Sequence, residues 1–202
     1  SDLYGTRDTA GPSRLRSAAE CKIPQVISLG GADFFLFEDD EPVPRHLIEE
    51  AGTRGKYIHN ASVVNYGINT QEAYEIGCEF ARRINPACAP TVLCIPMRGW
   101  CANDCKDNGE GKPGVLWLGD EKRPEVSARS ISFCRGLENT LKDRENQNLE
   151  VLIVDRHIND REFSQLMAEL LTEMLAGRWQ KGSHTNLAYV RSLRSQTLTK
   201  LE

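Results

Sequence analysis

Three short apolar runs along the chain predict buried strands. Each run is rich in β-branched residues and is followed by a polar or glycine-containing turn, as is typical of a strand covered on both faces. The three runs are Pro24–Leu29, Thr91–Ile95 and Glu150–Val154. A shorter segment, Lys56–His59, predicts a fourth strand.

Helical periodicity alternates with these runs. The clearest example is 160–175, where apolar residues recur every three or four positions. Helices are also predicted over 12–21, 71–84 and 125–141. Because strands and helices alternate, we expect an α/β fold: a three-layer Rossmann-like domain with a mainly parallel sheet and helices on both faces. We expect this domain to span 1–182, and 183–202 to form a docking helix or a flexible tail.

Composition and charge narrow the class of protein. The chain has 202 residues, of which 40% are hydrophobic and 27% charged, in the range of a soluble globular domain. Since no window reaches eighteen consecutive apolar residues, no membrane-spanning helix is expected. The net charge is −4, and basic residues gather only near the C-terminus. Neither nucleic acid nor a membrane is therefore an expected partner.

The seven cysteines predict free thiols. Their number is odd, their spacing is irregular, and several lie in apolar runs, where free cysteine packs as a small hydrophobic residue. The N-terminal residues resemble no secretory leader. We therefore expect a reducing, cytoplasmic compartment. Cys101 and Cys105 form a Cys-x3-Cys pair without a second pair, so no metal site is predicted.

The candidate chemistry lies in the polar turns that follow the predicted strands, because open parallel sheets bind ligands where their strands end. The first turn contains Gly30, Gly31 and Asp33. Its paired glycines would let backbone N–H groups approach a phosphate or a carboxylate. The turn lacks the third glycine of a dinucleotide-binding motif and the lysine of a P-loop. A tight turn capped by Asp33 would explain the same residues.

The second turn contains Arg98, Gly99, Cys101 and Asp104. An arginine at a strand end can bind a carboxylate or phosphate through two parallel hydrogen bonds. Asp104 could orient that arginine or act as a base, and Cys101 could be a nucleophile only if its pKa were lowered. The alternative is a structural Arg–Asp pair beside buried cysteines.

The third turn contains Asp155, His157 and Asn159. An acid and a histidine at a strand-to-helix junction can transfer protons, although these residues could equally cap the helix or hydrogen-bond a neighbouring loop. His59 and Asn60 form a fourth candidate, since they follow a short apolar segment. The two histidines could converge on one site.

These candidate residues are compatible with three functions. The first is a module that binds a small anion, a nucleotide or a carboxylate, through the paired glycines and Arg98. The second is a hydrolase or lyase acting on a small carboxylate through His157 and Asp104. The third is an interaction module in which the helix at 160–175 docks a partner or forms a homodimer.

The order of the motifs resembles a known family over roughly residues 11 to 178. The matching segments are Gly31-Ala32-Asp33, His59-Asn60-Ala61, Pro96-x-Arg98-Gly99 and Asp155-x-His157-Ile158-Asn159-Asp160. Together they resemble the C-terminal half of the family of the tomato mosaic virus resistance protein, the Tm-like ATP-binding family. The chain departs from the family pattern at Cys101, where the family has a serine, and near Gly67, where it has an arginine.

The resemblance implies a protein of two Rossmann-like domains, of which this chain is the second. It implies ATP and a divalent metal as cofactors, with ATP held mainly by the N-terminal domain. It also makes that N-terminal domain the expected partner of this one, with a site shared between them.

Overall fold

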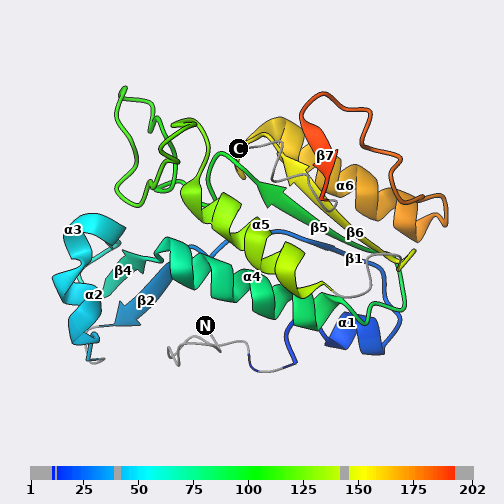
Figure 1. Cartoon of the computed structure of the whole chain (residues 1–202), viewed down its shortest axis with the longest axis horizontal. Helices are drawn as coiled ribbons and strands as arrows, with labels where there is room; N and C mark the ends of the chain where they lie inside the picture. The colour runs from blue at the N-terminus through cyan, green and yellow to red at the C-terminus, as the bar shows by residue number, and fades with distance from the viewer. Residues whose placement is uncertain (1–10, 12, 39–41, 142–145, 194–202) are drawn as a thin grey trace.

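The computed structural model describes residues 11, 13–38, 42–141 and 146–193. Figure 1 shows one larger sheet with helices packed around it and a smaller sheet to one side. The elements in chain order are α1 (Ser17–Glu20), β1 (Gln25–Ile27), β2 (Phe34–Glu38), α2 (Arg45–Glu49), α3 (Ala51–Arg54), β3 (Lys56–Ile58), β4 (Val63–Gly67), α4 (Thr70–Ile84), β5 (Thr91–Pro96), α5 (Ala128–Thr140), β6 (Leu149–Val154), α6 (Arg161–Leu175) and β7 (Val190–Ser192).

The larger sheet has the order β1-β5-β6-β7. β1, β5 and β6 are parallel, and they are the three strands that the apolar runs predicted. Every residue of β5 and β6 is buried, which explains why these strands read as continuous apolar runs. β7 adds an antiparallel edge beside β6.

Helices cover both faces of this sheet, so the predicted three-layer α/β architecture is confirmed. α4 and α5 pack on one face together with Leu93 and Ile95, whereas α6 packs on the other with Val92 and Cys94. In Figure 1 α4 and α5 run side by side. Glycines make this approach possible, because a Cβ at Gly77 or Gly136 would overlap a backbone carbonyl of the opposite helix.

The smaller sheet was not predicted. It is antiparallel, with the order β2-β4-β3, and the segment expected as a fourth strand, Lys56–His59, provides β3 here instead. Phe35, Phe37 and Tyr66 point from it into the main core. This sheet branches off between β1 and α4, so the connection between parallel strands β1 and β5 carries an extra unit.

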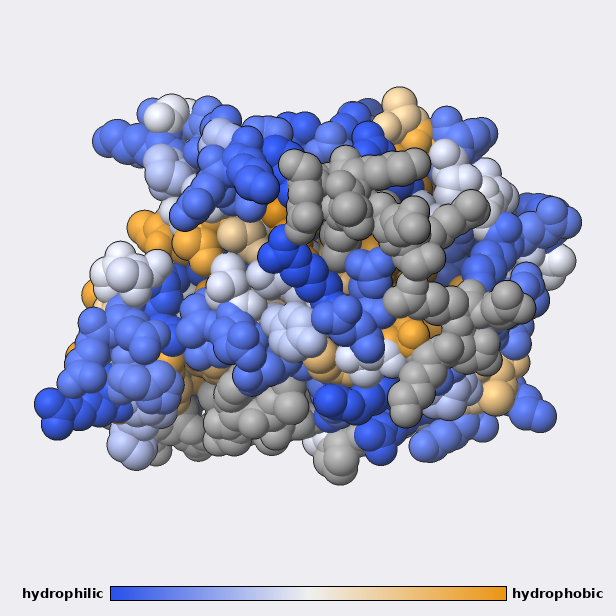
Figure 2. All heavy atoms as spheres, viewed as in Figure 1, coloured by the Kyte–Doolittle hydropathy of each residue, from blue (hydrophilic) through white to orange (hydrophobic). Residues whose placement is uncertain are grey.

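The long polar stretch 101–125 forms a loop, since no helix or strand lies between β5 and α5. Figure 1 shows it projecting in green beside the small sheet, and Figure 2 shows that its projecting part is hydrophilic. Its base is anchored, because Leu116 is buried and donates its N–H to the carbonyl of Asn103 over 2.9 Å.

Two terminal predictions differ from the structure. The helix expected over 12–21 is reduced to the single turn α1. The described part of 183–202, residues 183–193, contains strand β7 and no helix, and Leu193 donates its N–H to the carbonyl of Val151 over 2.8 Å. Residues 194–202 lie outside the described residues, and the boundary at 182 stays a prediction. None of the described helices has the length and apolar content needed to span a bilayer.

Candidate functional site

Three polar turns meet where the parallel strands end: 28–33 after β1, 97–104 after β5 and 155–160 after β6. We call this region the carboxyl edge. Ile158 joins the turns, because its N–H donates to the carbonyl of Gly99 over 3.1 Å and its Cδ1 lies 3.5 Å from the position of a Cβ on Gly30. Neighbouring parallel strands have their carboxyl ends at the same edge of the sheet, which brings their turns together in this way.

Arg98 and Asp155 form an ion pair at the rim of the carboxyl edge. Nε donates to Oδ1 over 2.8 Å and Nη2 to Oδ2 over 3.1 Å. The side chains are 42% and 51% exposed. Hydrogen bonding to Asp155 raises the pKa of Arg98, and the same contact lowers the pKa of Asp155. The sequence suggested Asp104 as the partner of Arg98, but the structure places Asp155 in that role.

The pair leaves hydrogen-bond donors of Arg98 unused. Nη1 has no acceptor among the described residues, although Glu125 and Asp160 act on the guanidinium electrostatically. Because Asp155 holds the opposite edge of the guanidinium, the plane is fixed and Nη1 is presented at the rim.

The turn after β1 contributes two further donors. Gly30 and Gly31 are exposed, and their N–H groups have no acceptor among the described residues. Gly31 has a φ of 75°, and nothing lies within 4 Å of a Cβ built there. Glycine adopts this conformation without strain, so the backbone is open to an approaching group.

Asp33 lies beneath this turn and does not cap it. Its side chain is fully buried, and neither carboxylate oxygen has a hydrogen bond of good geometry among the described residues. Burial and the nearby Asp104 carboxylate raise the pKa of Asp33 to about 6, while the Cys101 thiol and Arg129 act in the opposite direction. Asp33 is therefore a buried carboxyl group that ionises with difficulty.

Cys101 interacts with Asp33 and stays a thiol. It is partly buried, and burial together with the Asp33 carboxylate raises its pKa. A thiol with a raised pKa supplies little thiolate at neutral pH, so this environment does not favour a nucleophile. All seven cysteines are free in the structure.

Asp104 belongs to a buried ion pair that sequence reasoning missed. Its Oδ1 accepts a hydrogen bond from Nη1 of Arg129 over 2.9 Å, and its Oδ2 accepts from the N–H of Trp100 over 3.0 Å. Both side chains of the pair are fully buried. Burial raises the pKa of Asp104, although Arg129 opposes the shift.

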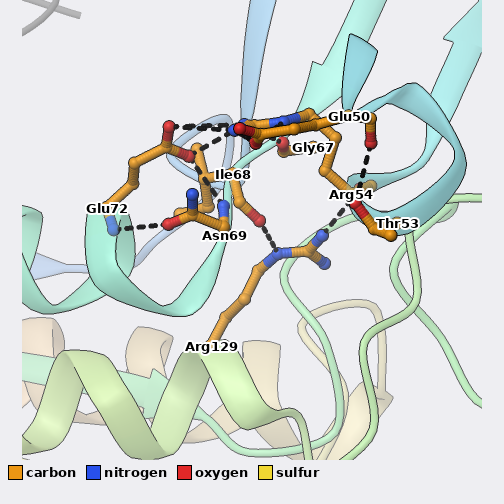
Figure 3. Close-up of polar contacts among 8 residues, drawn as sticks. All are labelled: Glu50, Thr53, Arg54, Gly67, Ile68, Asn69, Glu72 and Arg129. Carbon is orange, nitrogen blue, oxygen red and sulfur yellow. Dashed lines mark hydrogen bonds and ion pairs between the residues drawn. The ribbon is translucent and has the colours of Figure 1, made fainter. Parts of the chain in front are cut away.

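Arg129 also ties together segments that are far apart in the sequence. Its guanidinium donates to the carbonyl groups of Ile68 over 2.6 Å and Arg54 over 3.1 Å, and to that of Leu116. In Figure 3 Arg129 rises from α5 toward the turn that joins β4 to α4. It therefore fastens the small sheet and the long loop to the parallel sheet.

A second buried arginine, Arg54, reaches the same turn from α3. It donates to the carbonyl of Gly67 over 3.0 Å and pairs with Glu72 over 2.9 Å and with Glu50 (Figure 3). Glu72 in turn accepts from the N–H of Asn69 over 2.7 Å, which completes the capping box at the start of α4. The network orients α4 relative to the small sheet.

His157 is engaged through both ring nitrogens. Nδ1 accepts the N–H of Asn159 over 3.1 Å, and Nε2 lies 3.0 Å from the carbonyl of Cys101, so these partners assign the proton to Nε2. Its backbone N–H donates to Asp160 over 2.8 Å, and Asp160 makes no side-chain cap bond to α6. The contacts of His157 hold two turns together.

His59 and Asn60 lie away from the carboxyl edge. They are exposed in the hairpin between β3 and β4, where Asn60 accepts the N–H of Ser62 over 2.8 Å. The His59 ring contacts Tyr57, with centroids 6.0 Å apart. None of these contacts brings His59 toward His157.

A metal site was not expected, and the resemblance nevertheless implied a divalent metal. Within the described ranges, no three His, Cys, Asp or Glu side chains are arranged so that they could hold a metal ion. The donor set at the carboxyl edge is dominated by N–H groups, which suit anions and not cations.

Comparisons with known proteins agree with the resemblance in the sequence. Residues 1–175 match the C-terminal domain of the uncharacterised protein family UPF0261. A UPF0261 protein of Clostridium tetani is 33% identical over 175 residues, which cover 86% of this chain and 38% of that protein. The ToMV resistance protein Tm-1(GCR237) of Solanum lycopersicum is 26% identical over 162 residues, which cover 80% of this chain and 19% of that protein.

A UPF0261 protein of Brucella melitensis is also similar, with 26% identity over 163 residues that cover 79% of this chain and 33% of that protein. The chain thus spans well under half the length of these relatives. The predicted resemblance to the family of the tomato resistance proteins is confirmed. The chain belongs to the uncharacterised protein family UPF0261, whose C-terminal domain it matches.

Proposed function

We propose that this domain binds a small anion, a carboxylate or a phosphate, at its carboxyl edge. The observation that carries the proposal is a set of unmatched donors: the N–H groups of Gly30 and Gly31, and Nη1 of Arg98. Backbone N–H groups and a fixed guanidinium are the donors that proteins use for such ligands.

The charges around the site favour a compact ligand. Asp155, Glu125 and Asp160 all act on Arg98. An extended polyanion would meet these carboxylates, whereas a small anion can contact the donors alone. Because the three turns are already joined through Ile158, the donors are positioned before the ligand arrives, which lowers the entropic cost of binding.

The other functions weighed from the sequence receive less support from the contacts. Both nitrogens of His157 and both oxygens of Asp104 are occupied by structural hydrogen bonds, so no reaction is proposed. Exposed apolar side chains on α6 are few, chiefly Leu171 and Leu175. On the face in Figure 2 apolar atoms form only small patches. Pairing with a further domain or a second copy stays a prediction.

Thermal unfolding in the presence of ligands tests the proposal. The panel contains sulfate, phosphate, citrate, malonate and ATP, each at constant ionic strength. An anion that binds the native state raises the midpoint of unfolding by mass action. We expect at least one compact anion to do so, and the ATP implied by the family resemblance is included as one candidate.

Two variants locate the site. Arg98→Ala should weaken binding about tenfold to a hundredfold, because a hydrogen bond to a charged group contributes about 1.5–3 kcal/mol. Arg45→Ala is the matched control, since Arg45 forms a comparable exposed pair with Glu49 on α2, at 2.7 Å. Equal binding by all three proteins, or no shift with any anion, would reject the proposed function.

A further inference from the structure

A buried carboxyl group, Asp33, belongs to the same turn as the proposed anion site. Asp33 follows Gly31 by two residues, so their Cα atoms are at most about 7 Å apart. Asp33 is fully buried, and the peptide oxygen of Asp33 is fixed by the N–H of Ile68 over 2.9 Å. The backbone of Asp33 is therefore held in place, and its side chain is out of contact with solvent.

The groups that face Asp33 leave its negative charge poorly balanced. From the loop after β5 come the Asp104 carboxylate and the Cys101 thiol, and from α5 comes Arg129. Arg129 already pairs with Asp104 and donates to three carbonyl groups. His157, in the turn after β6, acts on Asp104. One guanidinium thus serves two buried carboxylates.

We infer that Asp33 takes up a proton when an anion binds at the carboxyl edge, so that acid tightens binding at this site. The inference rests on the proposed function and adds its regulation. A second negative charge near Asp33 disfavours the ionised carboxylate further, because like charges in a weakly hydrated region repel strongly. A protonated Asp33 removes that repulsion.

The coupling between proton uptake at Asp33 and anion binding should be measurable near neutral pH. Burial raises the pKa of Asp33 to about 6, so the group is largely ionised at pH 8 and largely protonated at pH 5. An anion bound at the turn raises this pKa further. By linkage, the anion must bind more tightly in the protonated protein by the same factor.

Sulfate is the probe of choice, because its charge does not change between pH 5 and pH 8. Isothermal titration calorimetry at constant ionic strength should give a dissociation constant about three- to tenfold lower at pH 5 than at pH 8. Titrations at pH 6.5 in two buffers with different ionisation enthalpies should show uptake of a fraction of one proton.

Asp33→Asn separates this effect from other titrating groups. The amide has no charge to lose, so the variant should bind sulfate tightly at both pH values and should take up no proton through residue 33. Asp107→Asn, at an exposed aspartate of the projecting loop, makes the same charge change and should behave like the wild type. A pH dependence that persists in Asp33→Asn would overturn the inference.

The two proposals fail in different ways. Sulfate binding that is lost in Arg98→Ala but is independent of pH in the wild type leaves the proposed function intact and refutes the role of Asp33. An absence of binding by sulfate and by every other anion of the panel at both pH values refutes both, because there is then no anion to couple to the proton.

Discussion

Two arginines near the carboxyl edge each pair with an aspartate, yet their surroundings differ completely. Arg129 is fully buried and has an acceptor for each of its nitrogens, including the Asp104 carboxylate. Arg98 is 42% exposed and meets Asp155 alone, with Nη1 unused. A guanidinium whose donors are all matched inside the protein holds the fold together, whereas one that presents unmatched donors at the rim is suited to a ligand.

The comparison predicts the largest loss of stability for Arg129→Met. The apolar chain of methionine replaces much of the volume, but the Asp104 carboxylate and three carbonyl groups lose their donor. Breaking one partner of a buried ion pair costs about 3–5 kcal/mol, which urea unfolding would measure. A second change, Asp104→Asn, should recover part of this loss because it removes the unpaired charge. A loss below about 1 kcal/mol would show that the pair is not what fastens the two sheets.

Gly99→Ala should have the next largest effect, because it disturbs the turn that carries Arg98. Gly99 has a φ of 122°, and a Cβ there would overlap the carbonyl of Asp104 and lie 2.9 Å from Cδ2 of His157. Strain and overlap together should cost roughly 2–4 kcal/mol in the free energy of unfolding. Gly52→Ala is the control, since nothing lies within 4 Å of its Cβ. Equal stability of the two variants would contradict the packing of this turn.

Asp33→Asn should stabilise the protein at neutral pH. At about pH 3 and below, the carboxyl group is largely protonated in both the folded and the unfolded chain, so it has little effect on the free energy of unfolding. As the pH rises from its ordinary pKa of 3.8 to its folded pKa of about 6, the unfolded chain ionises first and the free energy of unfolding falls. The wild type should lose roughly 2–3 kcal/mol across this window, and the variant should lose less. Parallel pH profiles for the two proteins would disprove the assignment.

Cys101→Ser should give a smaller gain in the free energy of unfolding. The Cys101 thiol interacts with the Asp33 carboxyl group, and a hydroxyl group is a stronger hydrogen-bond donor than a thiol. The variant should be more stable at pH 8 by about 0.5–1 kcal/mol and should have a lower pKa at Asp33. Cys101→Ala, which removes the donor, should shift both quantities the other way. A loss of stability in the serine variant would place the thiol in apolar contacts instead.

Arg98→Ala should have the smallest effect on stability. Exposed ion pairs contribute about 0–1 kcal/mol, so unfolding in urea should change by less than about 0.5 kcal/mol. The same variant should lose anion binding. This combination would show that Arg98, unlike Arg129, contributes to binding and not to stability. A large loss of stability would instead show that both arginines stabilise the fold.

Much of the fold was accessible from the sequence, because β5, β6 and α6 have patterns that few other structures produce. The small sheet was missed for a physical reason. β3 and β4 are short, and their hairpin depends on packing against α3 and the main core rather than on local periodicity. The pattern Lys56–His59, a polar turn and Val63–Gly67 nevertheless carries a hairpin signal.

The sequence predicted where the candidate site lies but not which charged side chains pair with one another there. Sequence spacing put Asp104 close to Arg98, yet partners are set by which strands are neighbours, and β6 brings Asp155 beside β5. The sequence does contain a signal that Arg129 is buried and paired. It lies four residues before Phe133 and eight before Leu137, on the buried stripe of α5, where a charged residue needs buried partners.

A titration of the 15N-labelled protein with sulfate, followed by NMR, would show whether the carboxyl edge binds an anion. We expect the amide signals of Gly30 and Gly31 and the Nε–H signal of Arg98 to shift together, with one dissociation constant, and Arg98→Ala to abolish the shifts. Shifts confined to other regions, such as the hairpin that carries His59, or no saturable shifts at all, would contradict an anion site at the carboxyl edge.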